Sequence, residues 1–127
     1  MESINEAALI DVLHQLESAC PAFSGAVVAT RDGLVLAFAG GHRGDTPAAC
    51  AASMAFHLQD DLQHLTADGE TGPREALVFG ACTTWYLSRL RTDHLLLIES
   101  RQTVHAGAVR LAGQTATSRL NRWLGDS

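Results

Sequence analysis

The beginning of the chain places apolar side chains three or four positions apart, which is the spacing of one helix face. The residues that share this face are Leu9, Val12, Leu13, Leu16 and Cys20. Ser3 and Glu6 have the spacing of a capping box, in which two side chains satisfy free N–H groups at a helix start. Pro21 cannot extend a helix. The pattern predicts a first helix from about residue 4 to residue 19.

Two runs of β-prone residues follow, separated by a short polar turn. The runs are 26–30 and 34–38, and the turn between them contains Asp32 and Gly33. An Asp-Gly pair between two such runs is typical of a tight β-hairpin. We therefore predict a hairpin at this position.

A second helix is predicted from about residue 46 to residue 65. Asp45 or Thr46 followed by Pro47 supplies an N-cap and a proline in the first turn. One face of this helix is apolar at helical spacing and suits contact with a sheet. That face consists of Ala51, Ala55, Leu58, Leu62 and Leu65.

Three short apolar runs, at 76–79, 85–87 and 95–98, indicate three more strands. Their connections are too short for a crossover helix, so the strands form an antiparallel meander. A last helix is predicted from about 103 to 124, weakened by Gly107 and Gly113. The order is αββαβββα. Because runs such as 34–38 and 95–98 are apolar at consecutive positions, we expect helices on both faces of the sheet.

Composition limits the remaining possibilities. A chain of 127 residues, 46% hydrophobic, suits one domain over 1–127 with one core that needs no disulfide or metal. Fourteen acidic residues against nine basic ones disfavour nucleic acid and anionic membranes as partners. No apolar run approaches a membrane span, and no secretory signal is evident. Three widely spaced cysteines suit free thiols in a reducing compartment, so we expect a cytoplasmic protein.

The first half of the second helix is small or apolar on nearly every side. The residues concerned are Ala48, Ala49, Cys50, Ala52, Ser53, Met54 and Phe56. A helix that is apolar all round is normally buried all round, and the sheet can cover only one side. The chain has no spare helix, so the same helix of another copy is the simplest cover. We therefore predict a homodimer.

With this order of elements, the chain resembles the roadblock / dynein light chain family, including its bacterial MglB-like branch. The segments that carry the resemblance are 25–37, 45–55, 86–90 and 107–110, and the most specific is Thr30-Arg31-Asp32-Gly33-Leu34-Val35. Together they extend over nearly the whole chain. One departure is near His105, where the family pattern leads us to expect an asparagine.

The resemblance implies an α/β (α+β) fold: a five-stranded antiparallel sheet between the second helix and the other two. It implies dimers that join sheets edge to edge while their second helices pack together. It also implies a non-enzymatic regulator or scaffold, without cofactor or metal, that binds a small Ras-like GTPase over the paired helices. We assign the dimer interface to Ala48, Ala49, Ala52, Ser53, Phe56, Leu77 and Phe79. We assign the GTPase-binding surface to Cys50, Met54, His57, Asp61 and His64.

Other chemistry is conceivable at the same residues. His57, Asp61 and His64 share a helix face and could ligate zinc, but no fourth ligand is visible, so a polar rim beside the dimer seam is favoured. Cys50 with His42 could form a nucleophilic pair, but a small residue at a helix contact explains Cys50 better. The glycine-rich segment 40–44 lacks the Lys-Ser/Thr ending of a P-loop.

An alternative function is a profilin-like sensor of a small ligand in a bacterial signalling pathway. Such a sensor needs a roomy pocket between the sheet and a helix. The large side chains of Phe38, Phe79 and Trp85 indicate filled space instead.

Overall fold

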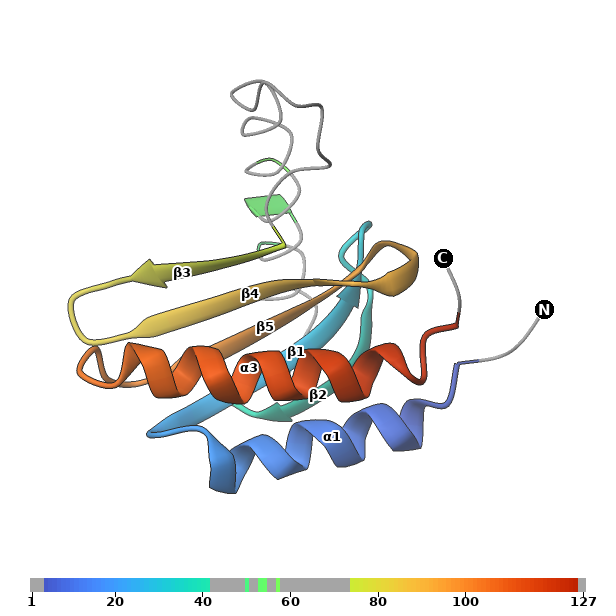
Figure 1. The fold of residues 1–127 in the computed structure, drawn as a ribbon. Helices are drawn as coiled ribbons and strands as arrows, with labels where there is room; N and C mark the ends of the chain where they lie inside the picture. Colours follow the sequence, from blue (N-terminus) through green and yellow to red (C-terminus); the bar gives the residue numbers. More distant parts are fainter. Residues whose placement is uncertain (1–3, 42–49, 51–52, 55–56, 58–73, 126–127) are drawn as a thin grey trace.

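The computed structural model describes residues 4–41, 50, 53–54, 57 and 74–125. Figure 1 shows the helices and strands of these ranges. In chain order they are α1 (Glu6–Ala19), β1 (Phe23–Thr30), β2 (Val35–Gly40), β3 (Glu75–Phe79), β4 (Thr84–Leu90), the short 3-10 helix η1 (Arg91–Asp93), β5 (His94–Ser100) and α3 (Ala106–Asn121). Most of the predicted second helix lies outside the described residues. Its four described residues, Cys50, Ser53, Met54 and His57, are helical.

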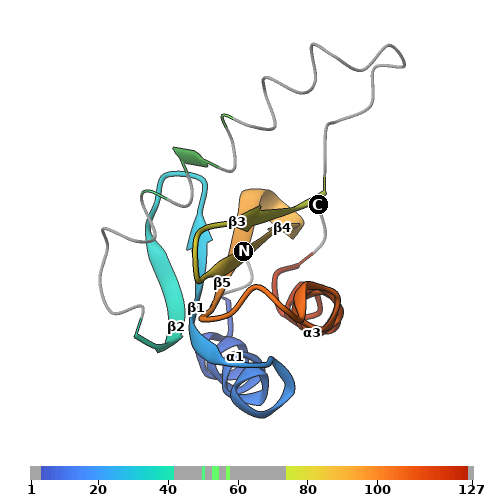
Figure 2. The ribbon, with the colours of Figure 1, turned by 90° about the vertical axis from the view of Figure 1, so that its left-hand side faces the viewer.

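The five strands form one antiparallel sheet in the order β2-β1-β5-β4-β3. The predicted hairpin of β1 and β2 and the predicted meander of β3, β4 and β5 are both confirmed. The pairing of β1 with β5 joins the two halves of the chain, from Phe23↔Ser100 to Thr30↔His94. Consequently β2 and β3 are the two edges of the sheet. α1 and α3 lie side by side against one face, as Figures 1 and 2 show.

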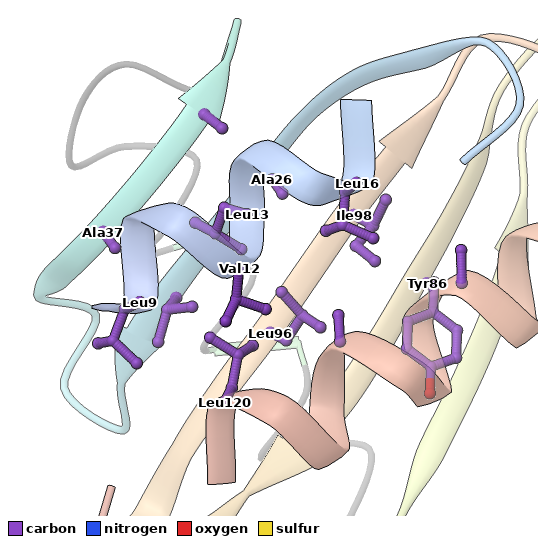
Figure 3. Packing of buried hydrophobic residues seen from close by; sticks show 14 of the residues in the cluster. Leu9, Val12, Leu13, Leu16, Ala26, Ala37, Tyr86, Leu96, Ile98 and Leu120 are labelled. Carbon is purple, nitrogen blue, oxygen red and sulfur yellow. The ribbon is translucent and has the colours of Figure 1, made fainter. Parts of the chain in front are cut away.

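The main core lies between this face and the two helices (Figure 3). Large side chains of α1, such as Leu9 and Leu13, pack on small strand residues, such as Ala26 and Ala37. The small residues let the helix approach the sheet closely, and the leucines fill the layer between them. α3 adds Leu120 and its neighbours to the same cluster. The helix-face spacing that predicted α1 is thus the spacing that builds the core.

The opposite face of the sheet is also covered at its centre. Its buried residues are Val27, Ala29, Leu87, Leu95 and Leu97. The prediction that consecutive apolar residues indicate two covered faces is therefore confirmed for β1 and β5. It is wrong for the run 34–38, where Leu34 is 63% exposed and Phe38 is 45% exposed. The reason is that β2 is an edge strand, in which only Ala37 and Ala39 are fully buried.

The start of α1 differs from the predicted capping box. The N-cap is Asn5, whose Oδ1 accepts a hydrogen bond from the backbone N–H of Ala8 at 3.1 Å. Asparagine is as good an N-cap as serine, so the helix begins two residues later than the Ser3 pattern predicted. The hairpin turn agrees with prediction, since Gly33 adopts a φ of +85°, which an Asp-Gly turn requires.

α3 is shorter at both ends than predicted. It begins after His105, whose side chain makes no cap, and the Oε1 atom of Gln102 accepts the N–H groups of Val104 and His105 instead. The predicted weakening by Gly113 has a packing reason: a Cβ atom there would lie 2.4 Å from Cε2 of Tyr86. Neither of the helices described in full is long and apolar enough to cross a membrane.

Candidate interaction surface

Four described residues of the predicted second helix form one exposed stripe. Cys50, Ser53, Met54 and His57 follow each other at steps of three, one and three, so they share one side of a helix. All four are exposed, and Met54 is 52% exposed. In Figures 1 and 2 the short segment at residues 53–54 lies on the side of the sheet away from α1 and α3. The stripe is therefore open to a partner on that side.

The orientation of the His57 ring determines which of its nitrogens can accept a hydrogen bond from a partner. Its Nδ1 atom lies 2.8 Å from the carbonyl oxygen of Ser53 and 3.2 Å from the Ser53 hydroxyl. A carbonyl oxygen can only accept, so Nδ1 carries the proton in this contact. In the neutral ring, Nε2 is then a hydrogen-bond acceptor. The stripe thus combines a thiol, a polarisable thioether and an imidazole acceptor.

The other residues assigned to the second helix lie outside the described residues. They are Ala48, Ala49, Ala52, Phe56, Asp61 and His64. Of the helical residues assigned to the dimer seam, only Ser53 is described, and it shares its stripe with Cys50, Met54 and His57. The assignment of these residues to separate surfaces stays a prediction.

The strand β3 supplies the other predicted contact residues. Leu77 is half-buried beside the main core, and Phe79 is 55% exposed. Among the described strands β3 pairs only with β4, so its outer edge presents backbone N–H and C=O groups. Its sequence, Glu-Ala-Leu-Val-Phe, has no proline and one charge, which leaves few of the features that normally protect an edge strand from pairing.

The only charged residue of β3, Glu75, is hydrogen-bonded to side chains of the same molecule. The Glu75 carboxylate accepts hydrogen bonds from the Tyr86 hydroxyl at 2.7 Å, from Nε of Arg110 at 2.6 Å and from Nε2 of Gln114 at 3.3 Å. Burial acts to raise the pKa of Glu75, but the hydrogen bonds from these three side chains and the charge of Arg110 lower it below its ordinary value. The cluster ties the edge strand to α3 and holds β3 in place.

The sequence pattern alone did not indicate this cluster. Tyr86 is the only tyrosine of the chain, and it lies in an apolar strand, so its hydroxyl required a buried partner. That requirement was the available signal. Burial, with the Glu75 hydrogen bond, raises the pKa of Tyr86 to about 12. The ring is fixed between the carboxylate and the backbone of α3 at Gly113.

A second polar cluster lies at one end of the sheet face opposite to α1 and α3. The Glu99 carboxylate accepts hydrogen bonds from the Ser24 hydroxyl at 2.8 Å and from Nε1 of Trp85 at 3.1 Å. The Trp85 ring also lies against Gly80, where a Cβ would be 3.0 Å from the ring. Trp85 is therefore held by contacts on two sides, in agreement with the expectation that it fills space. The same expectation is wrong for Phe38 and Phe79, which are 45% and 55% exposed because they lie on the two edge strands.

A groove runs along the outer side of the α1/α3 pair. One cavity of about 320 Å³ lies near the end of α1 and the start of α3, and an adjoining one of about 330 Å³ lies at the other end. Val12, Gln15 and Arg119 line both cavities, and the Arg119 guanidinium donates a hydrogen bond to Oε1 of Gln15 between the two helices. Leu111, on the rim of the first cavity, is 65% exposed.

The thiols and the predicted metal ligands are further reactive groups of the chain. Cys20 is buried, and burial raises its thiol pKa to about 11. Cys50 and Cys82 are exposed free thiols, so Cys50 is not buried within its own chain. Of the possible zinc ligands only His57 is described. Within the described part of the chain, no three His, Cys, Asp or Glu side chains are grouped to hold a metal ion.

Comparison with solved structures identifies the fold. The gliding protein MglB from Thermus thermophilus superimposes with a TM-score of 0.80 and 23% identity, over 96% of this chain and 92% of that one. An MglB described as having a tetrameric arrangement superimposes with a TM-score of 0.80 and 24% identity, over 96% of this chain and 91% of that one. A Roadblock/LC7 domain from Streptomyces avermitilis superimposes with a TM-score of 0.79 and 19% identity, over 91% of this chain and 96% of that one. The chain has the roadblock fold. The fold implied by the family resemblance is thereby confirmed.

The likeness of this chain to other proteins is one of structure. No family model and no curated protein sequence matches it. Profilin II from Acanthamoeba castellanii is a more distant structural neighbour, with a TM-score of 0.58 and 12% identity over 91% of this chain and 95% of that one. The roadblock arrangement therefore fits the chain better than the profilin arrangement.

Proposed function

We propose that this roadblock chain is a homodimeric, non-enzymatic regulator or scaffold that binds a small Ras-like GTPase in the cytoplasm. The observation that carries the proposal is the match of nearly the whole chain to MglB and Roadblock/LC7 structures. Bacterial members of the family that the chain resembles bind such GTPases as dimers. The exposed helical stripe gives this chain a surface on which a GTPase can dock.

Dimerisation is supported by two features of the chain. Among the described strands, β3 has a neighbour on one side only and its one charge is already paired, so a second copy of β3 can extend the sheet at that edge. The small and apolar residues of the second helix, Ala48, Ala49, Ala52 and Phe56, would pack against their counterparts about the same two-fold axis. Leu77 and Phe79 would lie beside that axis on the strand.

GTPase binding is assigned to the stripe that includes Met54 and His57, and on the continuation of that helix to Asp61 and His64. A thioether adapts its shape to an apolar pocket, and exposed methionines are common at binding surfaces. The Nε2 acceptor of His57 would take one hydrogen bond from the GTPase. Cys50 would lie at the margin of the contact.

A catalytic role for the stripe is disfavoured by its geometry. Ser53 and His57 are hydrogen-bonded, which is a feature of nucleophile and base pairs. However, the His57 nitrogen that faces the Ser53 hydroxyl also donates to the Ser53 carbonyl, so it already carries a proton. It cannot accept the serine proton in that state. The pair therefore supports a binding role.

The proposal is tested by measuring binding of candidate Ras-like GTPases, each loaded with GDP or a GTP analogue. We expect one GTPase to bind in a nucleotide-dependent manner, and Met54→Glu to weaken it by about tenfold or more, which corresponds to about 1.4 kcal/mol. The matched control is Leu34→Glu, an equally large change at a residue 63% exposed in the hairpin turn. Absence of nucleotide-dependent binding to any GTPase, or equal loss in both variants, would contradict the proposal.

No observation favours the profilin-like sensor. Such a sensor needs a cavity between the sheet and a helix, whereas the groove described above lies between two helices on the outside of the molecule. The apolar residues of the central strands are fully buried instead.

A further inference from the structure

A cavity of about 320 Å³ opens between α1 and α3, on the outside of the helix pair (Figure 1). On the α3 side it is lined by Ala108, Ala112 and Ala116, whose methyl groups leave the layer between the two helices partly unfilled. Val12 and Leu16 of α1 continue this apolar lining. The cavity has the volume at which binding sites for small molecules begin.

Leu111 stands at the edge of this cavity and is 65% exposed. Among the described residues, Val104 is the one large hydrophobic residue that is more exposed. A hydrocarbon group in the cavity would remove part of the Leu111 side chain and part of the apolar lining from water, which is favourable. The lining therefore favours a ligand with a hydrocarbon chain.

The ligand must also match one positive charge. Arg119 is the one charged side chain among the described residues that line the cavity. Its guanidinium donates to Oε1 of Gln15, which is a neutral acceptor, so this hydrogen bond leaves the charge of Arg119 uncompensated. None of the ion pairs between described residues includes Arg119. The guanidinium has further N–H groups in a planar fork that suits a carboxylate.

The position of Arg119 determines how such a ligand would lie. Arg119 lines both this cavity and the adjoining one, whereas Ala19 and Ala108 line only this one, so Arg119 is at the end next to the adjoining cavity. Asp11 and Arg122 line only the adjoining cavity, which therefore carries charges of both signs and suits a hydrocarbon chain poorly. A carboxylate on Arg119 would direct its chain toward Ala108.

We propose that this cavity binds a medium-chain carboxylate anion, with the carboxylate on Arg119 and the hydrocarbon chain along Val12, Leu16 and Ala112. At about 30 Å³ for each water-sized group, a volume of about 320 Å³ holds about ten such groups. This is the number of non-hydrogen atoms in octanoate, an eight-carbon acid. An amine of the same length would meet Arg119 with a like charge, and an alcohol would leave that charge unmatched.

This site is separate from the two functions discussed above. It lies on the opposite side of the sheet from the helical stripe proposed to bind a GTPase, so neither inference depends on the other. It also lies between two helices, whereas a profilin-like sensor needs a cavity between the sheet and a helix.

Four small ligands test the charge and the chain separately by titration calorimetry. Octanoate should bind the wild type most tightly. Octanol should bind about tenfold more weakly, because a hydrogen bond to a carboxylate is replaced by one to a neutral oxygen. Butyrate should also lose about tenfold or more, since each fully buried CH₂ group contributes about fourfold in affinity. Octylamine should show no measurable binding.

Variants of the cavity and matched controls then locate the site. Arg119→Gln should weaken octanoate about tenfold and leave octanol unchanged, whereas Arg101→Gln removes an exposed arginine outside both cavities and should alter neither. Ala108→Phe fills the far end of the cavity and should weaken octanoate and octanol alike. Ser118→Phe places the same side chain at an exposed position of α3 outside both cavities and should have no effect.

Amide chemical shifts measured during the octanoate titration should change most around Ala112 and Ala116. The proposal is overturned if octanoate binds the wild type no more tightly than octanol, or if Arg119→Gln and Arg101→Gln change the ratio of the two affinities equally. Shift changes confined to residues outside the cavity would also overturn it. None of these results bears on GTPase binding, which is measured on the other side of the sheet.

Discussion

A methyl group added at Gly113 tests how tightly α3 packs on β4. The new Cβ would lie 2.4, 2.5 and 2.8 Å from three carbons of the Tyr86 ring, whereas ordinary contacts begin near 3.4 Å. The ring is 1% exposed and its hydroxyl is bonded to Glu75, so it has little room to move. Gly113→Ala therefore requires α3 or β4 to shift by about 1 Å.

The expected magnitude follows from two opposing effects. Overpacking of a core costs about 1–3 kcal/mol, and the severity of this overlap places Gly113→Ala at or beyond the upper end of that range. Alanine is favoured over glycine inside a helix by about 1 kcal/mol, which offsets part of the cost. We expect a net loss of about 2 kcal/mol in the free energy of unfolding, or a urea midpoint lower by about 1 M.

Gly107 provides the matched control in the same helix. Nothing lies within 4 Å of a Cβ built at Gly107, so Gly107→Ala should leave stability unchanged or raise it by up to about 1 kcal/mol. Both variants and the wild type are unfolded in urea at one protein concentration, because self-association makes stability concentration-dependent. Equal stability of Gly113→Ala and Gly107→Ala would refute the packing argument.

Three further predictions concern the polar cluster and the dimer. The pKa of Glu75 is lowered in the folded state, so its contribution to stability is present above the ordinary glutamate pKa and is lost as the pH falls through the lowered value. When unfolding is followed from pH 6 to pH 3, Glu75→Gln should therefore lose less stability than the wild type. The pKa of Tyr86 is raised to about 12, so the free energy of unfolding should fall as the pH rises from about 10 to about 12, by an amount on the order of 2 kcal/mol. Tyr86→Phe should lack this alkaline loss of stability in titrations followed by circular dichroism. Ala52→Glu should split the proposed dimer, because it places an unpaired charge in a desolvated seam; light scattering that finds the wild-type mass would move the interface elsewhere.

Much of the fold was predictable because the hydrophobic spacing reports which side chains face the core. The stripe from Leu9 to Leu16 and the Asp32-Gly33 turn each depend on local geometry, and the structure confirms both. The pairing within the hairpin and within the meander was predicted from the turn and from connections too short for helices, whereas the pairing of β1 with β5 was not predicted. What the spacing could not show was which strands are edges, and so the exposure of Phe38 was missed.

The polar clusters were beyond local reasoning because they join residues far apart in sequence. Glu75 and Arg110 meet only after β3 has paired with β4 and α3 has packed on the sheet. The close contact of Gly113 with Tyr86 depends on the same packing, and in the sequence that glycine only signals a weaker helix. A buried tyrosine without a neighbouring partner was the one available signal.

The central claim is tested most directly by the mass of the complex between this chain and a Ras-like GTPase, measured by sedimentation with GDP and with a GTP analogue. The account predicts that a complex forms in one nucleotide state and that it contains at least two copies of the 13.5 kDa chain. A chain that sediments as a single copy, or that forms no complex in either nucleotide state with any GTPase tested, would contradict it.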